Sequence, residues 1–137
     1  MLFAIAAAIG VFGACGLLDT PVQGGSATII VGERSFELED IEAGTTLGNV
    51  LDKLAADGEI VFEYTQFSFG RQLDVLGGLV PGVGEFIAVY LTASRVNLWA
   101  VTPTTEVDGV IFWSANVGID AMPIFDGTTY LFRIEGW

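Results

Sequence analysis

Apolar and polar residues alternate along much of the chain from residue 27 onward, a pattern typical of β-strands buried on one face. The β-branched run 27–31 is followed by Gly32-Glu33, a pair suited to a tight turn, and then by the alternating segment 34–39. In that second segment the apolar side chains face one way, and the serine and glutamates face the other. We therefore predict a β-hairpin with one wet face.

The spacing of apolar residues changes after this hairpin, from every second residue to the 3.6-residue period of a helix. The apolar positions at helical spacing are Leu47, Val50, Leu51 and Leu54. Thr45 or Thr46 can act as the N-cap, and Gly58 stands just past the end. The spacing predicts a helix over 46–57, with its apolar side chains buried against the sheet.

The rest of the chain returns to strand patterns. We predict strands at 59–65, 71–79, 85–92, 95–102, 107–115 and 128–135. A hairpin, one helix and then strands is the order of the β-grasp fold, in which the last strand lies centrally and parallel to the first. We therefore expect an α+β protein with a β-grasp-like mixed sheet and one helix packed on one face. Tyr130, Phe132 and Ile134 should face that helix.

The first residues differ from the rest, because residues 1–18 carry no charge and residues 2–14 are all apolar or glycine. An apolar run of this length is shorter than the ~20 residues of a transmembrane helix, but it matches the apolar region of a secretory signal. We expect a signal peptide over 1–14. Met1 need not be the true start, because no Lys or Arg precedes the apolar run.

Cys15 is the only cysteine, and it follows Gly13-Ala14 and precedes Gly16. This stretch resembles the lipobox of prokaryotic lipoproteins, although Phe12 stands where Leu is usual. The resemblance implies cleavage before Cys15 and acylation of its sulfur. Residues 15–26 would then be a lipidated tether that holds the protein outside the cytoplasm on a membrane, at the cell surface or in the periplasm. The alternatives are a buried core cysteine, an ordinary signal peptide, or residues 1–18 retained as an apolar helix in an assembly.

Composition narrows the possible chemistry. The chain has no histidine and its one cysteine is assigned to lipid, which excludes Ser-His and Cys-His nucleophile pairs and histidine-based metal sites. The net charge of −12 disfavours nucleic acid and anionic headgroups as partners. The acidic cluster Glu37, Glu39, Asp40 and Glu42 matches no calcium loop, and we interpret it as strand and loop charges. We predict neither catalysis nor a bound metal.

Three stretches carry a resemblance to a known family: "TTLGNVLDKLAADG", "LDVLGGLVPGVGEFIAVYLT" and "VGIDAMPIFDGTTYLFRIE". In the last, Gly118-Ile119-Asp120 is followed by Asp126-Gly127 and an aromatic strand. The segment 43–135 resembles the transcobalamin-like C-terminal domain, found in vitamin B12 carriers and in many prokaryotic surface lipoproteins. The resemblance implies that 27–137 is one β-grasp domain of a family whose role in prokaryotic lipoproteins is mostly unknown. It makes a corrinoid-like ligand conceivable, and no cofactor is predicted.

The chain departs from that family in two places. Residues 93–115 add about two strands, which we expect to form an inserted β-hairpin. In the aromatic strand, Phe86 and Ile87 stand where Tyr and Trp are common in the family. The candidate ligand-binding residues are Tyr90, Trp99, Trp113 and Asn116. Aromatic rings at strand spacing can equally well be core residues.

Two functions remain after these exclusions. The first is a lipid-anchored, extracytoplasmic, non-catalytic binding module for a small molecule or a surface partner. The alternative is a structural or interaction subunit of a cell-surface assembly or filament that uses its strand edges. A concave aromatic pocket would favour capture of a small molecule, whereas an open edge strand would favour a protein partner.

Overall fold

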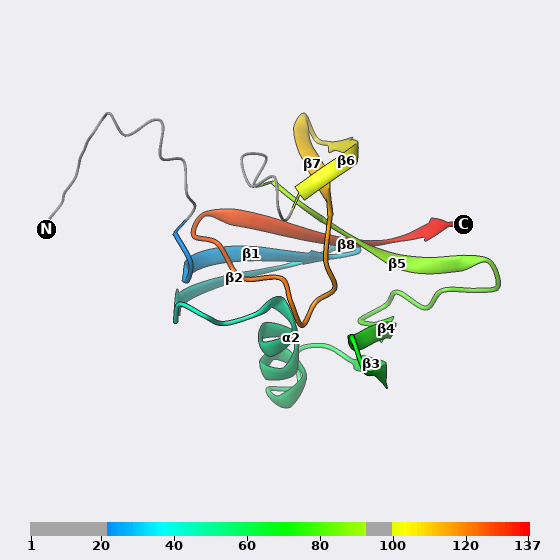
Figure 1. Cartoon of the computed structure of the whole chain (residues 1–137), viewed down its shortest axis with the longest axis horizontal. Coiled ribbons are helices and arrows are strands. Elements are labelled where there is room, and N and C mark those ends of the chain that lie inside the picture. The colour runs from blue at the N-terminus through cyan, green and yellow to red at the C-terminus, as the bar shows by residue number, and fades with distance from the viewer. Residues whose placement is uncertain (1–21, 93–99) are drawn as a thin grey trace, which may run out of the picture.

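The computed structural model describes residues 22–92 and 100–137. The elements are β1 (Gly25–Val31), β2 (Arg34–Ile41), α2 (Leu47–Ala56), β3 (Phe62–Phe67), β4 (Gly70–Leu76), β5 (Glu85–Leu91), β6 (Ala100–Val107), β7 (Val110–Ala115) and β8 (Thr128–Gly136). Six of these strands form a mixed sheet in the order β2-β1-β8-β5-β7-β6, and β3 and β4 form a separate two-stranded sheet (Figure 1). The predicted α+β class, with a β-grasp-like mixed sheet, is confirmed.

The last strand lies inside the sheet, as predicted. β8 runs parallel to β1, with Ala27 opposite Thr128 and Val31 opposite Phe132, and it pairs antiparallel with β5 on its other side. Tyr130 and Phe132 are fully buried on the face toward α2. The Tyr130 hydroxyl donates to the Pro123 carbonyl and accepts from the Phe125 N–H, at 2.9 and 2.8 Å.

α2 begins and ends as its sequence predicts, and its apolar side covers one face of the sheet (Figure 1). Thr46 Oγ1 accepts from the Asn49 N–H at 3.1 Å, and Asn49 Oδ1 accepts from the Thr46 N–H at 3.0 Å. This reciprocal pair is a capping box. All of the predicted helical core positions are buried: Leu47, Val50, Leu51 and Leu54.

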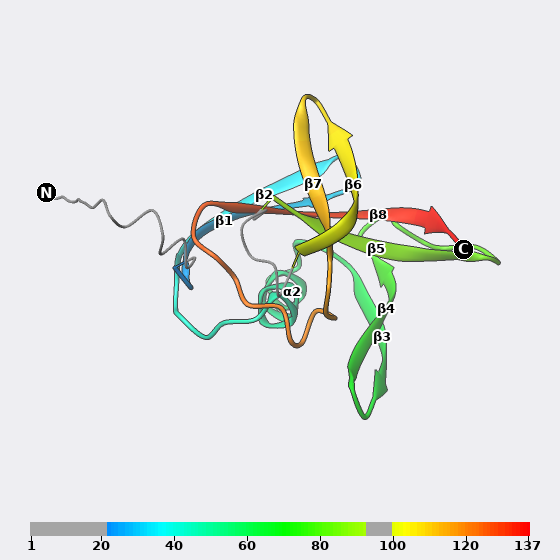
Figure 2. The same cartoon turned by 45° about the horizontal axis from the view of Figure 1, so that its top comes forward.

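The inserted hairpin is present, and residues 95–99 of its predicted first strand, 95–102, lie outside the described residues. The segment 107–115 is not one strand, because Asp108 and Gly109 form a turn with φ of 52° and 81° that separates β6 from β7. β6 therefore occupies Ala100–Val107, which carries little apolar alternation. The hairpin projects on the side of the sheet opposite α2 (Figure 2).

An arginine connects the small β3–β4 sheet to the rest of the domain. Arg71 of β4 pairs with Asp120 at 2.7 Å and with Asp52 of α2 at 2.6 Å. The Arg71 backbone N–H also donates to Asp120 Oδ2 at 2.8 Å. Gly48 lets α2 approach this cluster, since a Cβ at that position would collide with the Asp120 carboxylate. The Gly118-Ile119-Asp120 motif is thus a structural junction.

The first described residues, 22–26, belong to the predicted tether 15–26 yet are attached to the domain. Gly25 and Ser26 lie in β1. The Asp126 N–H donates to the Val22 carbonyl at 2.7 Å, and the Ser26 N–H donates to Asp126 Oδ1 at 2.8 Å. The predicted signal peptide 1–14 and Cys15 lie outside the described residues. In the described ranges, no helix has the length and apolarity to cross a membrane.

Candidate functional site

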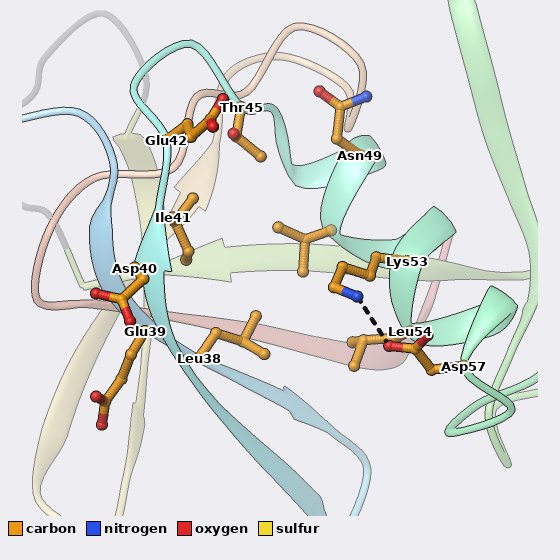
Figure 3. Close-up of a pocket in the computed structure, with 11 residues that line it drawn as sticks. Leu38, Glu39, Asp40, Ile41, Glu42, Thr45, Asn49, Lys53, Leu54 and Asp57 are labelled. Atoms are coloured by element: carbon orange, nitrogen blue, oxygen red, sulfur yellow. Dashed lines mark hydrogen bonds and ion pairs between the residues drawn. The ribbon is translucent and has the colours of Figure 1, made fainter.

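A groove of about 260 Å³ separates the edge strand β2 from α2. Figure 3 shows the side chains that line it: Leu38, Ile41 and Leu54 point into the space between the two walls, whereas Glu39 and Asp40 project from the outer side of β2. Its apolar floor is made by Leu38, Ile41, Val50 and Leu54. Val50 and Leu54 are also part of the core under the sheet, so the groove is an open continuation of that core at the sheet edge.

The rim of this groove is charged, and its two sides differ. On the helix side Lys53 Nζ pairs with Asp57 Oδ2 at 3.1 Å, drawn as a dashed line in Figure 3. The β2 side carries the exposed carboxylates of Glu39, Asp40 and Glu42. Since the lysine is already paired with a carboxylate, the rim as a whole is negative.

The wall formed by β2 is an edge of the six-stranded sheet. β1 pairs with it on one side, and no described strand lies on the other. Val31 and Arg34 flank a two-residue turn and face each other, which makes them a hydrogen-bonded pair. In an antiparallel ladder, hydrogen-bonded positions alternate with positions whose N–H and C=O groups point away from the partner strand. Ser35 and Glu37 occupy these alternate positions, so their N–H and C=O groups point to the open edge.

A β-bulge in β2 limits the length of this open edge. The register shifts between Gly25 and Ala27, so β2 bulges between Leu38 and Ile41. Asp40 in this bulge has a φ of 57°, a left-handed conformation that Asp tolerates better than most residues. The bulge ends the regular part of the edge after Leu38.

The predicted ligand-binding residues do not gather on one surface. Tyr90 pairs with Ser114, and Leu91 pairs with Trp113, so the tyrosine and the tryptophan point to opposite faces of the sheet. Tyr90 packs with Phe112 and Leu131, whereas Trp113 packs against the main core. Asn116 lies exposed after β7. Trp99 lies outside the described residues.

Tyr90 borders a second depression of about 420 Å³. The hydroxyl and the ring of Tyr90 already have partners within the chain. Its hydroxyl donates to Glu135 Oε2 at 2.8 Å, and the Arg133 guanidinium lies 5.2 Å from its ring centre. Burial, with the neighbouring Glu135, raises the pKa of Tyr90. Arg133 also bonds Glu135 at 2.6 Å and lowers the pKa of that carboxyl. The ring is therefore held by the protein's own cation.

A wider depression of about 700 Å³ lies at the β1–β2 turn, and it is lined largely by turn residues and glycines. Its cation, Arg34, donates to the Glu59 carbonyl at 2.6 Å. No three His, Cys, Asp or Glu side chains within the described ranges are grouped so that they could hold a metal ion. The α2–β2 groove, with an apolar floor and an unneutralised rim, is thus the best-formed candidate site.

Comparison with solved structures finds the same fold elsewhere. A crystal structure from Ruminococcus gnavus ATCC 29149, described as a "putative metal binding protein", matches with a TM-score of 0.51. The match covers 84% of this chain and 98% of that one, with 13% sequence identity. At this identity the similarity concerns the fold alone. No protein-family model matches the chain, and neither does any curated protein.

Proposed function

We propose that this protein is a lipid-anchored, extracytoplasmic binding module that holds a small molecule or a surface partner in the α2–β2 groove. One observation carries the proposal: the groove exposes an apolar floor beside carboxylates that no described cation neutralises. An apolar cleft with a few charged groups at its rim is the usual form of a binding site.

The other parts of this proposal rest on the sequence. The uncharged N-terminus and the lipobox-like stretch around Cys15 support lipid anchoring outside the cytoplasm. The lack of histidine supports binding without catalysis. Membership in the transcobalamin-like family is part of the same proposal, supported by the β-grasp order of the elements and by the motif at Asp120.

A metal ion is a further candidate ligand, favoured by the printed description of the Ruminococcus gnavus protein. Glu39, Asp40 and Glu42 supply oxygen ligands of the kind that calcium prefers. They are not grouped as a ligand set in the structure, and for this reason we place the metal second.

The proposal can be tested by isolating the lipidated protein from its native membrane and identifying what co-purifies by native mass spectrometry and elemental analysis. Lys53→Trp should block the groove, because Lys53 is exposed and lines it. Ala56→Trp is the matched control, on an exposed position of the same helix outside the groove. We expect the bound component to be lost from Lys53→Trp only. Equal retention by both variants would place the site elsewhere.

A further inference from the structure

We infer that the natural occupant of the α2–β2 groove is an extended segment of a partner protein, which adds to β2 as a further strand. The segment would carry apolar residues at alternate positions and Lys or Arg between them. This inference rests on the proposed function, and it specifies the class of ligand.

The backbone of β2 supports this type of binding. Ser35 and Glu37 direct their N–H and C=O groups to the open edge, and the turn at Gly32-Glu33 fixes their register. An added strand would form main-chain hydrogen bonds there, as in β-augmentation generally. The bulge after Leu38 sets the far end of the pairing.

Side chains of the added strand would meet two different surfaces. Alternate residues of a strand point to opposite faces of the sheet. On the face that carries α2, the paired part of an added strand would reach the Leu38 and Leu54 end of the groove, and its continuation past the bulge would extend over the rest of the floor beside Ile41 (Figure 3). Apolar side chains at every second position would cover this floor and close the exposed continuation of the core.

The residues between these positions would lie on the other face, beside Glu37 and Glu39. Both glutamates are exposed on that face of β2, and Asp40 and Glu42 extend the negative charge along the same edge. Opposite charges on neighbouring strands attract, and like charges repel. The acidic edge therefore favours a basic segment and disfavours edge-to-edge pairing with a second copy of this chain.

Selection from a display library of random ten-residue peptides on the full lipidated chain in detergent tests the inference. We expect enrichment of peptides that alternate apolar residues with Lys or Arg, and loss of that enrichment on Lys53→Trp but not on Ala56→Trp. Enrichment of acidic peptides, or of apolar residues at helical spacing, would overturn it.

The selected peptide then separates backbone pairing from simple charge attraction. Binding should protect the Ser35 and Glu37 amide protons from hydrogen exchange in NMR spectra. N-methylation of every second peptide bond on the pairing edge should weaken binding at least about tenfold, because these bonds lose their donors. Unchanged affinity after N-methylation would show that no strand is added.

Charge is tested with two variants that each remove three negative charges. Glu37→Gln/Glu39→Gln/Asp40→Asn changes the proposed edge. Glu63→Gln/Glu106→Gln/Asp108→Asn changes two exposed strand glutamates and a positive-φ aspartate elsewhere. At low salt we expect the first variant to weaken peptide binding about tenfold and the second to have little effect. Equal effects would overturn the role of this edge.

A small amphipathic cation, octylammonium, distinguishes failure of this inference from failure of the proposed function. If octylammonium shifts the groove resonances and no peptide does, the groove is a small-molecule site and only the strand proposal is wrong. If neither probe shifts them and the native component survives Lys53→Trp, the proposed function is wrong as well.

Discussion

Asp120, together with Arg71, joins three parts of the chain: the 118–120 segment, β4 and α2. It accepts from the Arg71 guanidinium and from the Arg71 backbone N–H, while the same guanidinium reaches Asp52 on α2. The arginine also lies 4.9 Å from the ring centre of Tyr64 and 5.4 Å from that of Phe62. The Arg71 side chain is only 11% exposed, so these contacts exclude most water and the ion pair is worth more than a surface pair.

Asp120→Asn should lower the free energy of unfolding at pH 7 by about 1 to 3 kcal/mol, because it removes charge from a partly buried hydrogen-bonded pair. Arg71 lowers the pKa of Asp120 in the folded state. The stabilisation is therefore complete above about pH 4, the range of an unfolded Asp, and is lost as the pH falls through the folded pKa. Urea unfolding at pH 7 and pH 3 should show a smaller loss in acid for the variant than for the wild type.

Asp108→Asn is the control for that measurement, because Asp108 is exposed in the β6–β7 turn. It should leave stability within about 0.5 kcal/mol of the wild type at both pH values. Equal pH dependence of wild type and Asp120→Asn would show that the Asp120–Arg71 pair contributes no stability.

Single residues also mark the limit of what the sequence could predict about the site. Tyr90 and Trp113 were expected as candidate ligand contacts because both are aromatic, but the face of each ring depends on the register of β5 against β7. A shift of one residue reverses the face of every side chain on a strand. No residue near Tyr90 or Trp113 determines that register, so the separation of the two rings could not be predicted.

α2 is the element that depends most clearly on its own sequence. Its N-cap, its end and its buried face follow from residues within the helix and the first residues after it. Leu51→Ala should lower the free energy of unfolding by about 2 to 5 kcal/mol, because Leu51 is fully buried between the helix and the sheet. Lys53→Ala, on the exposed side, should change it by less than about 0.5 kcal/mol. Chemical denaturation measures both, and similar losses would mean that α2 does not cover the core.

β8 should be indispensable although it stands at the end of the chain. It contributes hydrogen bonds to β1 on one side and to β5 on the other. Deleting residues 130–137 should therefore remove the cooperative unfolding transition, measured by circular dichroism during heating. Removal of Trp137 alone is the control, since this side chain is 87% exposed and stacks only on Phe86 among the described rings. A cooperative transition in the longer deletion would contradict the central role of β8.

Elements were predicted well where the apolar period was strong and less well where a turn decided the outcome. The hairpin 27–39, α2 and the last strand have clear periods and were found in the structure. The boundary between β6 and β7 was misplaced, although Asp108-Gly109 is a common two-residue hairpin turn and was available as a signal. The β3–β4 sheet contacts the 118–120 segment through Arg71 and Asp120, which are 49 residues apart, and no local pattern predicts that contact.

At the scale of the whole molecule, the groove is made by elements that the sequence predicted separately. The acidic run from Glu37 to Glu42 and the helix could each be recognised in the sequence. Their juxtaposition depends on α2 packing under a sheet in which β2 is the edge. Such a site follows from tertiary packing and has no local sequence signature.

The proposed lipid anchor also concerns the whole molecule. Cys15→Ala should abolish membrane association and lipoprotein processing and leave the fold unchanged, if Cys15 serves only as the lipid acceptor. Membrane fractionation and mass spectrometry of the N-terminus would measure this, with circular dichroism as the test of folding. Normal processing and continued membrane association of Cys15→Ala would contradict lipidation.

The attachment of residues 22–26 to the 124–126 segment has a mechanical consequence. Seven peptide steps separate Cys15 from Val22, a reach of at most about 25 Å, so a lipid on Cys15 would keep the domain close to the bilayer. Tension between that lipid and a partner bound along β2 would pass through β1, which is hydrogen-bonded to both β2 and β8. Much of that load would run along the strands and be shared by many hydrogen bonds at once. With a lipid on Cys15, the domain would therefore resist pulling from its N-terminal end.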